Sequence, residues 1–260
     1  MKRWLLLFGF VGSIASGALV ESPVVYEQGG VKLEGFHVYD NEATGKRPGV
    51  LVVHQWTGLG DHEKEQSRKL AKLGYNVIAA DVYGQGVRPQ PPAAGKEAGK
   101  YKSDRKLLRE RLVAALNVLR NDERTDRAKV GAIGYCFGGM GVLELVRAGE
   151  DLKGVVSFHG SLGATSGMEA RKGIAHPEVL VLHGADDPNA PASEVEALRR
   201  ELGAAGVPFQ ITLYPGAVHA FTQKSAGNDP SKGAAYNQAA DEASWQAMKA
   251  FFERLFGKGE

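Results

Sequence analysis

The chain has 260 residues, of which 43% are hydrophobic and 24% are charged, and its formal net charge is +2. This composition is ordinary for one globular domain, and the length is sufficient to bury a sizeable core. Lysine and arginine are scattered among the acidic residues rather than gathered in a basic block with interleaved aromatic residues. Nucleic-acid binding is therefore not expected.

The first residues of the chain have the order of a secretory signal. Lys2 and Arg3 precede an apolar run over residues 4–11, and small side chains follow over residues 15–18. A charged segment, an apolar segment and a small-residue cleavage site together predict a signal peptide over residues 1–18. The alternative is an uncleaved N-terminal anchor, although the apolar run is short for a bilayer span. We expect a single domain over residues 19–260, located in the periplasm or secreted, with no membrane contact beyond the signal.

Strands and helices are predicted to alternate after the signal. An antiparallel hairpin comes first and turns at Gly29-Gly30. Asp61 is suited to the N-cap of the first helix and Ser103 is expected to open a later one, whereas the proline-rich stretch 83–102 between them is expected to be an irregular loop. Strands are predicted over 24–26, 31–39, 49–54, 77–80, 129–135, 154–158, 179–183 and 209–214, and helices over 61–73, from 103 through 119, and over 137–147, 192–203 and 239–256.

This alternation predicts the α/β class, with a mostly parallel central sheet flanked by helices on both faces and an N-terminal antiparallel hairpin. The continuous apolar run 49–54 is typical of a strand buried on both faces of such a sheet. Ligands bind beyond the carboxyl ends of parallel strands. The chemistry is therefore expected among the residues that directly follow predicted strands: Gln55, Tyr83, Cys136, Asp187 and His219.

The segment Gly134-Tyr135-Cys136-Phe137-Gly138 lies between a predicted strand and a predicted helix. A nucleophile at such a sharp turn requires glycine two positions before it and two after it. The usual nucleophile is serine, and here it is the only cysteine of the chain. A helix N-terminus favours the thiolate, which is the attacking species. The alternative is a glycine-rich turn around a small buried cysteine.

A nucleophile of this kind needs a base, and the base needs an acid that orients it. His219 follows the last predicted strand, which fits the chain order nucleophile, acid, histidine. Asp187 is preferred as the acid because it lies three residues after Gly184, and its neighbour Asp186 is the alternative. His219 could otherwise be an ordinary loop histidine.

An oxyanion hole needs two backbone N–H groups that point at the developing charge. The residue after the nucleophile, Phe137, supplies one of them. The other is expected from the loop after the strand 49–54, at Trp56, with Gln55 as the alternative. The ring of Trp56 could at the same time be a core aromatic.

Several of these segments together resemble the dienelactone hydrolase family, and the resemblance covers nearly the whole chain after the signal. It implies the α/β-hydrolase fold and a hydrolase of lactones or activated esters that uses no metal or cofactor and acts through an acyl-cysteine. The segments that carry the resemblance are HQWTGL at 54–59, ADVYG at 80–84, GYCFGG at 134–139, the Asp187 loop and GAVHAF at 216–221.

Three positions depart from the family pattern. Gln55 stands where the family typically has a glutamate that influences the resting thiol. Gln85 and Gln223 stand where members acting on dienelactone use two arginines for the substrate carboxylate. Glutamine offers only a neutral amide in place of a charged two-pronged fork, so dienelactone itself is not expected as the substrate. Arg88, from the long loop, could supply a cation instead.

The leading hypothesis is a hydrolase of small, neutral or weakly polar carboxylic esters or lactones. The alternatives are a non-catalytic exported binding protein on the same fold, and a thioesterase or acyltransferase with the same triad. The expected partner is a small-molecule substrate, and the expected state is a monomer or weak homodimer. The residues expected to line the substrate pocket are Gln55, Tyr83, Gln85, Arg88, His159, Phe221 and Gln223.

Overall fold

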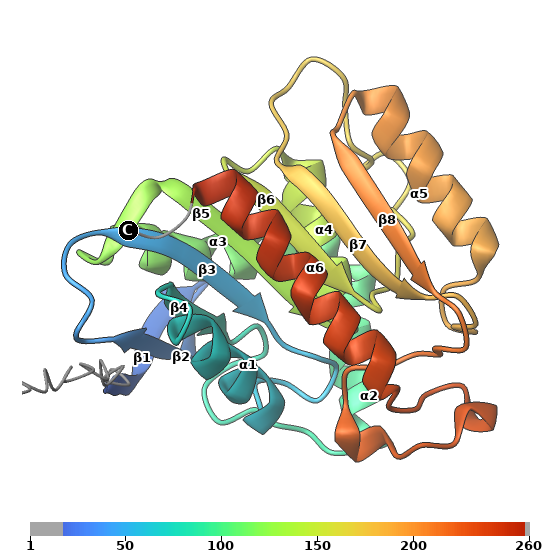
Figure 1. The fold of residues 1–260 in the computed structure, drawn as a ribbon, viewed down its shortest axis with the longest axis horizontal. Coiled ribbons are helices and arrows are strands. Elements are labelled where there is room, and N and C mark those ends of the chain that lie inside the picture. The colour runs from blue at the N-terminus through green and yellow to red at the C-terminus, as the bar shows by residue number, and fades with distance from the viewer. Residues whose placement is uncertain (1–17, 258–260) are drawn as a thin grey trace, which may run out of the picture.

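One eight-stranded sheet organises the computed structural model, which describes residues 18–257 (Figure 1). The strands lie in the order β1-β2-β4-β3-β5-β6-β7-β8. The first two strands form an antiparallel hairpin, β2 is antiparallel to β4, and the strands from β4 to β8 are parallel. Their bounds are β1 Leu19–Gln28, β2 Val31–Asp40, β3 Arg47–Val53, β4 Asn76–Ala80, β5 Thr125–Tyr135, β6 Gly154–Phe158, β7 Glu178–Gly184 and β8 Phe209–Tyr214.

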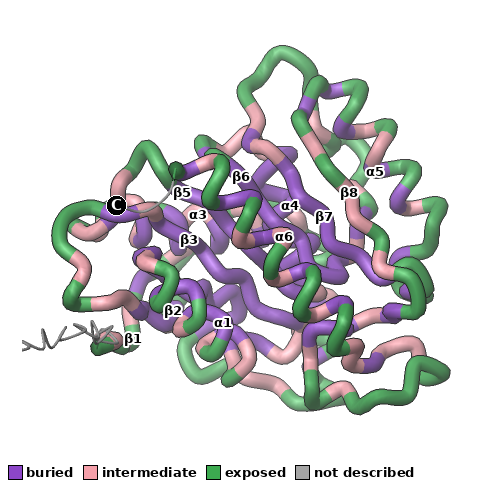
Figure 2. The backbone as a smooth tube through the Cα atoms, in the orientation of Figure 1, coloured by how far each residue is buried: buried purple, intermediate pink, exposed green. Residues whose placement is uncertain are grey.

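Helices cover both faces of the sheet, and the strand residues alternate between them. Val50 and Val52 of β3 belong to the hydrophobic cluster beneath α1 and α6, whereas Leu51 and Val53 belong to the cluster beneath α3, α4 and α5. Buried backbone runs through the middle of the sheet in Figure 2. The architecture confirms the predicted α/β-hydrolase fold. The helices are α1 Asp61–Ala71, α2 Ala93–Ser103, α3 Arg105–Asn121, α4 Phe137–Ala148, α5 Ala192–Ala205 and α6 Gln238–Phe256, with short 3-10 turns η1 Lys224–Ala226 and η2 Pro230–Lys232.

The prediction of an irregular loop over 83–102 is wrong for its second half, which forms helix α2. Ala94, Ala98 and Tyr101 are buried, and their spacing of four and three residues places them on one helix face. The prolines precede the helix, and Pro92 is its N-cap residue, so no helical N–H is lost to them.

The predicted N-cap of α1 and the predicted start of α3 are also wrong, although α1 begins at Asp61 as predicted. Ser103 ends α2, and the N-cap of α3 is Asp104, whose side chain accepts the N–H of Leu107 at 2.9 Å. The N-cap of α1 is Gly60, and Asp61 is the first helical residue. In both helices the N-cap is the residue next to the predicted one: Gly60 instead of Asp61, and Asp104 instead of Ser103.

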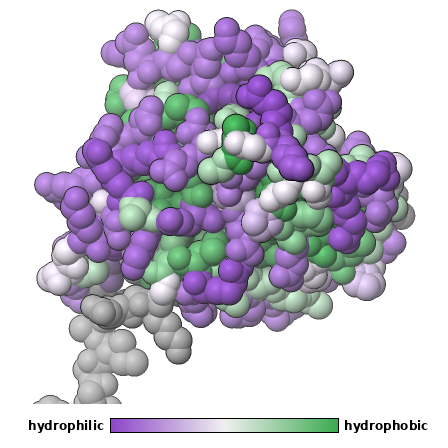
Figure 3. Space-filling model, turned by 90° about the horizontal axis from the view of Figure 1, so that it is seen from above, coloured by the Kyte–Doolittle hydropathy of each residue, from purple (hydrophilic) through white to green (hydrophobic). Residues whose placement is uncertain are grey.

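Residues 1–17 of the predicted signal peptide lie outside the described residues, so the signal and the export that it implies stay predictions. Between residues 18 and 257, no helix is long and apolar enough to cross a membrane. Hydrophilic side chains cover much of the face in Figure 3, with smaller hydrophobic areas between them. The large hydrophobic residues exposed on the described part of the chain are Val25, Val31, Leu73, Val87, Ile174 and Leu213.

Candidate active site

Cys136 occupies a sharp turn between β5 and α4. Its backbone has φ 54° and ψ −111°, a region that residues other than glycine rarely adopt and that costs free energy. A Cβ atom on Gly134 would lie 2.1 Å from the carbonyl oxygen of Gly138, and one on Gly138 would lie 2.1 Å from that of Val53. Glycine is therefore required on both sides of Cys136 by close backbone approach, and the turn holds the thiol at the N-terminus of α4.

Three side chains from separate loops meet at this turn. Nε2 of His219 lies 3.1 Å from Sγ of Cys136, and Nδ1 of His219 lies 2.8 Å from Oδ2 of Asp187. Asp187 is buried, and its second oxygen accepts the N–H of Asn189 at 2.8 Å. Asp186 instead accepts the N–H of Gly216 at 2.9 Å. Asp187, rather than Asp186, is thus the carboxylate that contacts His219.

The electrostatics of His219 follow from these two contacts. Burial by itself disfavours the charged ring, but the hydrogen bonds with Asp187 and Cys136 outweigh burial and raise the pKa of His219 to about 10. The imidazole therefore holds a proton near neutral pH. With Asp187 on Nδ1, the proton on Nε2 faces the sulfur of Cys136.

The loop that carries His219 is supported by the segment 224–237 between β8 and α6. The N–H of His219 donates to the carbonyl of Gly233, and the N–H of Ala235 donates to the carbonyl of His219. A Cβ atom on Gly233 would lie 2.9 Å from Pro188, beside Asp187. The segment therefore holds both the acid loop and the histidine loop. Sequence reasoning missed this support, although Asp229-Pro230 and Gly233 are turn residues that signal a local structure.

The two loops expected to supply oxyanion donors adjoin the elbow. Phe137 is the first residue of α4, where helix geometry leaves the backbone N–H without a carbonyl partner in the helix. The N–H of Gln55 already donates to Oε1 of Glu63 at 3.2 Å. The N–H of Trp56 is therefore the better candidate from this loop, and the ring of Trp56 also packs against the core.

An aromatic wall lies beside Phe137. The ring of Tyr83 meets that of His54 edge-on at 4.6 Å and stacks on that of Tyr101 at 5.3 Å, while Phe137 lies 5.6 Å from Tyr83. The hydroxyl of Tyr83 donates to the carbonyl of Trp56 at 2.9 Å. Burial raises the pKa of Tyr83, and the charge of nearby Cys136 adds to this. Tyr83 is therefore a neutral hydrogen-bond donor that joins the loop 54–60 to the elbow region.

His159 and Phe221 form a second group of rings, next to His219. The ring of His159 packs edge-on to that of His219 at 5.3 Å and to that of Phe221 at 5.1 Å. Nε2 of His159 is 2.8 Å from Oγ1 of Thr222, a contact that sequence reasoning missed. Burial, followed by the proximity of His219, lowers the pKa of His159 well below its usual value. His159 is therefore a neutral ring beside the charged one.

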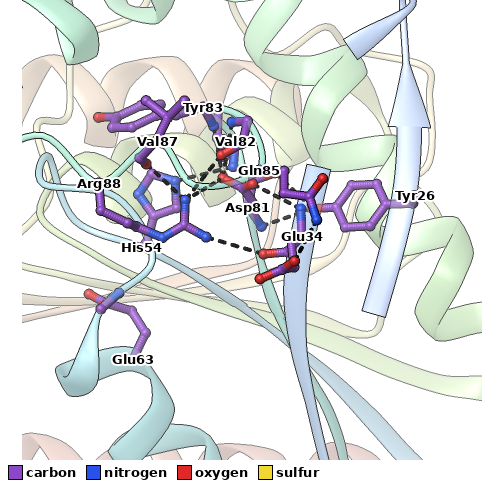
Figure 4. A network of polar contacts seen from close by, with 12 residues as sticks. Tyr26, Glu34, His54, Glu63, Asp81, Val82, Tyr83, Gln85, Val87 and Arg88 are labelled. Carbon is purple, nitrogen blue, oxygen red and sulfur yellow. Dashed lines mark hydrogen bonds and ion pairs between the residues drawn. The ribbon is translucent and has the colours of Figure 1, made fainter. Parts of the chain in front are cut away.

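Gln85 and Arg88 are engaged elsewhere (Figure 4). Nε2 of Gln85 donates to Oε2 of Glu34 at 2.7 Å, and the guanidinium of Arg88 donates to Oδ1 of the buried Asp81 at 3.3 Å and to the carbonyl of Gly84 at 3.1 Å. Both side chains thus belong to a network around Asp81 rather than to the group around Cys136.

The other two glutamines of the predicted pocket are Gln55, in the loop 54–60, and Gln223, four residues after His219. Gln55 is buried at the start of the loop 54–60. Gln223 follows Thr222, and its Nε2 atom is buried without a hydrogen-bond partner among the described residues. Within residues 18–257, no group of three or more histidine, cysteine or acidic side chains is arranged to hold a metal ion.

Comparison with known proteins agrees with the fold. The family model described as "Dienelactone hydrolase family" matches residues 33–256. The chain belongs to the dienelactone hydrolase family. The resemblance inferred from the motifs is confirmed, and the chain is a hydrolase of this family.

Relatives within and around the dienelactone hydrolase family match nearly the whole chain. An Escherichia coli (strain K12) protein named "Putative carboxymethylenebutenolidase" is 28% identical over 240 residues, covering 88% of this chain and 85% of its own. The crystal structure of a dienelactone hydrolase-like promiscuous phosphotriesterase, P91, from metagenomic libraries is 38% identical with a TM-score of 0.87, covering 93% of this chain and all of its own. A structure named m3DLH is 34% identical, with the same TM-score and coverage.

Proposed function

We propose that the protein hydrolyses small carboxylic esters or lactones through an acyl-enzyme on Cys136. The observation that carries this proposal is the continuous line of contacts from Asp187 through His219 to the sulfur, at 2.8 and 3.1 Å. These distances are within hydrogen-bond reach, as a nucleophile, its base and the orienting acid require.

The reaction proceeds in two halves. In the first half, Sγ of Cys136 attacks the ester carbonyl carbon as the thiolate, with His219 protonated, and the N–H groups of Phe137 and Trp56 stabilise the oxyanion. The tetrahedral intermediate collapses to a thioester as the alkoxide leaves with the proton from Nε2 of His219. In the second half, neutral His219 takes a proton from water while the hydroxide attacks the thioester. The carboxylic acid leaves, the sulfur departs, and His219 is again charged. Asp187 holds the ring orientation throughout.

A neutral or weakly polar substrate suits the chain better than an anionic one. At the two positions where the family resemblance implies arginines, the chain has Gln85, whose side chain is bound to Glu34, and Gln223; the guanidinium of Arg88 is bound to Asp81. A substrate carboxylate would lack the charged, bidentate partner that stabilises it on leaving water. The buried rings of Tyr83, His159 and Phe221 instead surround Cys136 and His219 with largely apolar side chains, which suits an uncharged substrate better than an anion.

Replacing Cys136 tests the proposal. We expect Cys136→Ala to reduce kcat/KM for p-nitrophenyl acetate by about a thousandfold or more, because the nucleophile is lost while the oxyanion donors remain. Alkylation of the wild-type protein with iodoacetamide should abolish turnover in proportion to labelling at Cys136, the only cysteine. Full turnover after complete labelling would refute the role of the thiol. Absence of Cys136-dependent hydrolysis across short esters and lactones would favour a binding protein.

A neutral phosphotriester is a second candidate substrate class. The relative P91, 38% identical over 93% of this chain, is named a promiscuous phosphotriesterase. A thiolate assisted by His219 can attack phosphorus as well as carbon, and the missing arginines leave a site suited to uncharged esters. Measuring paraoxon hydrolysis beside p-nitrophenyl acetate, in the wild-type protein and Cys136→Ala, separates the two. An acyl thioester in the same panel tests the thioesterase alternative.

A further inference from the structure

The loop 54–60 is held by two buried side chains that lie outside the Cys136–His219–Asp187 line. His54 is at the start of the loop, and Glu63 is in the first turn of α1, immediately after it. His54 is fully buried and Glu63 is 2% exposed. In Figure 4, His54 lies within the network around Asp81, whereas Glu63 lies apart from it on the neighbouring helix.

Glu63 binds the loop at both ends. Its Oε1 atom accepts the N–H of Gln55 at 3.2 Å, and its Oε2 atom accepts the N–H of Gly60 at 2.9 Å. An ionised carboxylate only accepts, and each hydrogen bond from an N–H to it is charge-assisted. Each carboxylate oxygen therefore accepts one backbone N–H, and these two N–H groups lie on either side of residues 56–59.

His54 holds the carbonyl of Gln55. Its Nε2 atom accepts the N–H of Val82 at 3.2 Å, so the proton of the neutral ring is on Nδ1, which donates to the Gln55 carbonyl at 2.5 Å. The N–H of Gly58 donates to the same carbonyl at 3.1 Å. Burial lowers the pKa of His54, which keeps the ring in this neutral form.

These contacts fix the direction of the next N–H group. In a planar trans peptide, the carbonyl of one residue and the N–H of the next point in opposite directions. The carbonyl of Gln55 and the N–H of Trp56 belong to one such peptide, so holding the carbonyl on one side aims the N–H toward the other. The carboxylate of Glu63 holds the preceding peptide in the same way.

We propose that Glu63 and His54 are positioning residues that aim the N–H of Trp56 at the oxyanion of the reaction. This inference rests on the proposed function, in which Trp56 supplies one of the two oxyanion donors. A donor fixed before the reaction stabilises the transition state without reorganisation, so its loss lowers kcat more than it raises KM.

Glu63→Gln tests the proposal with the shape of the side chain preserved. The amide offers one acceptor oxygen and one NH2 group, so one of the two N–H groups of the loop faces a donor instead of an acceptor. We expect kcat for p-nitrophenyl acetate to fall by about tenfold, with KM unchanged within about twofold, because a misaimed donor costs less than the loss of a donor. The matched control is Glu65→Gln on the same helix, where the exposed carboxylate pairs with Lys69 at 3.2 Å, and its kcat should be unchanged.

A pair of His54 variants provides the second measurement. In His54→Asn, the amide nitrogen can take the place of Nδ1 and still donate to the Gln55 carbonyl, whereas His54→Leu removes the donor. Both lose the contact with Val82 and the ring packing, so a purely structural role predicts equal kcat for the two. We expect His54→Asn to retain several-fold more kcat than His54→Leu.

Binding of a trifluoromethyl ketone links these effects to the oxyanion. The compound forms a tetrahedral adduct with the thiol, and its affinity for Glu63→Gln should fall by the same factor as kcat. Turnover of p-nitrophenyl acetate by Cys136→Ala is measured in parallel. If this variant is as active as the wild-type protein, the proposed function fails and this inference fails with it. If turnover depends on Cys136 but Glu63→Gln keeps the wild-type kcat, only the positioning role is overturned. If Glu63→Gln does not fold, the kcat of His54→Leu decides the same question.

Discussion

His219 illustrates how a single residue in this site depends on two neighbours at once. Asp187 and Cys136 bind opposite nitrogens of its ring, and both contacts favour the protonated form over the effect of burial. Because the unfolded chain lacks these contacts, His219 binds its proton more tightly in the folded state, and this difference adds to the free energy of unfolding. The charge state of His219 therefore links the chemistry of the site to the pH dependence of unfolding.

The stabilisation from His219 should be present at low pH and lost at high pH. Its pKa rises from 6.5 to about 10 on folding, so the contribution is complete below pH 6.5 and disappears as the pH rises through 10. We expect the difference in unfolding free energy between the wild-type protein and His219→Gln, measured by urea denaturation, to shrink over that range.

The same comparison in a Cys136→Ala background provides the control. This change removes one of the two hydrogen bonds that raise the pKa, so the loss of stabilisation should move to lower pH. A difference that is constant or grows from pH 6.5 to 10 would contradict the raised pKa.

Residues at the ends of strands could be predicted from the sequence, whereas several of the hydrogen bonds that hold neighbouring side chains could not. Cys136, Asp187 and His219 follow strands whose parallel order brings their carboxyl ends together, and the structure places them in contact. The contact of His54 with Val82 and that of His159 with Thr222 join residues 28 and 63 positions apart. Such contacts depend on side-chain rotamers and on strand register, which residue spacing does not reveal.

At the scale of elements, the elbow depends on how closely α4 approaches β3. The first turn of the helix lies against the end of the strand, and Gly138 leaves no room between them for a side chain. The same approach sets the position of Cys136, since its backbone joins β5 to this helix. Packing and chemistry therefore constrain the same residue.

Gly138→Ala should destabilise the protein by about 3 kcal/mol, since overpacking a tight interior contact costs roughly that amount. The added Cβ atom would lie 2.1 Å from the carbonyl oxygen of Val53, a backbone atom that cannot turn aside. Gly203→Ala is the matched control, because that glycine lies in α5 with nothing within 4 Å of the added atom. It should stabilise the protein by about 0.5 kcal/mol through helix propensity. Thermal unfolding checks both, and equal effects of the two changes would argue against the tight contact.

Strands were predicted more accurately than the region between β4 and α3. β6 and β8 have the predicted bounds, because each is a short run with clear turn residues on both sides. β1 begins five residues earlier than predicted, at Leu19, and it includes Pro23, which an edge strand tolerates. The sequence does not reveal helix α2, because prolines are typical of irregular loops, although here they only precede the first turn of the helix.

At the scale of the molecule, a buried ionic network joins three helices to the loop after β6. Arg147 of α4 binds Glu144 at 3.0 Å and Glu201 of α5 at 2.8 Å, and Arg109 of α3 binds Glu144 at 2.7 Å. Arg147 also donates to the carbonyl of Leu162 at 2.7 Å. Because Glu144 and Arg147 are buried, their charges are stable only while every partner is in place.

Arg147→Met should therefore destabilise the protein by about 3 kcal/mol or more, since it leaves part of the charge of buried Glu144 without a partner and removes a tie to α5. The matched control is Arg254→Met. Arg254 pairs with Glu178 at 2.6 Å, but its side chain is 56% exposed, so the pair is screened by water and its loss should cost less than about 1 kcal/mol. Urea denaturation of both variants at neutral pH measures the two costs. Similar values for Arg147→Met and Arg254→Met would mean that the network does not hold the three helices together.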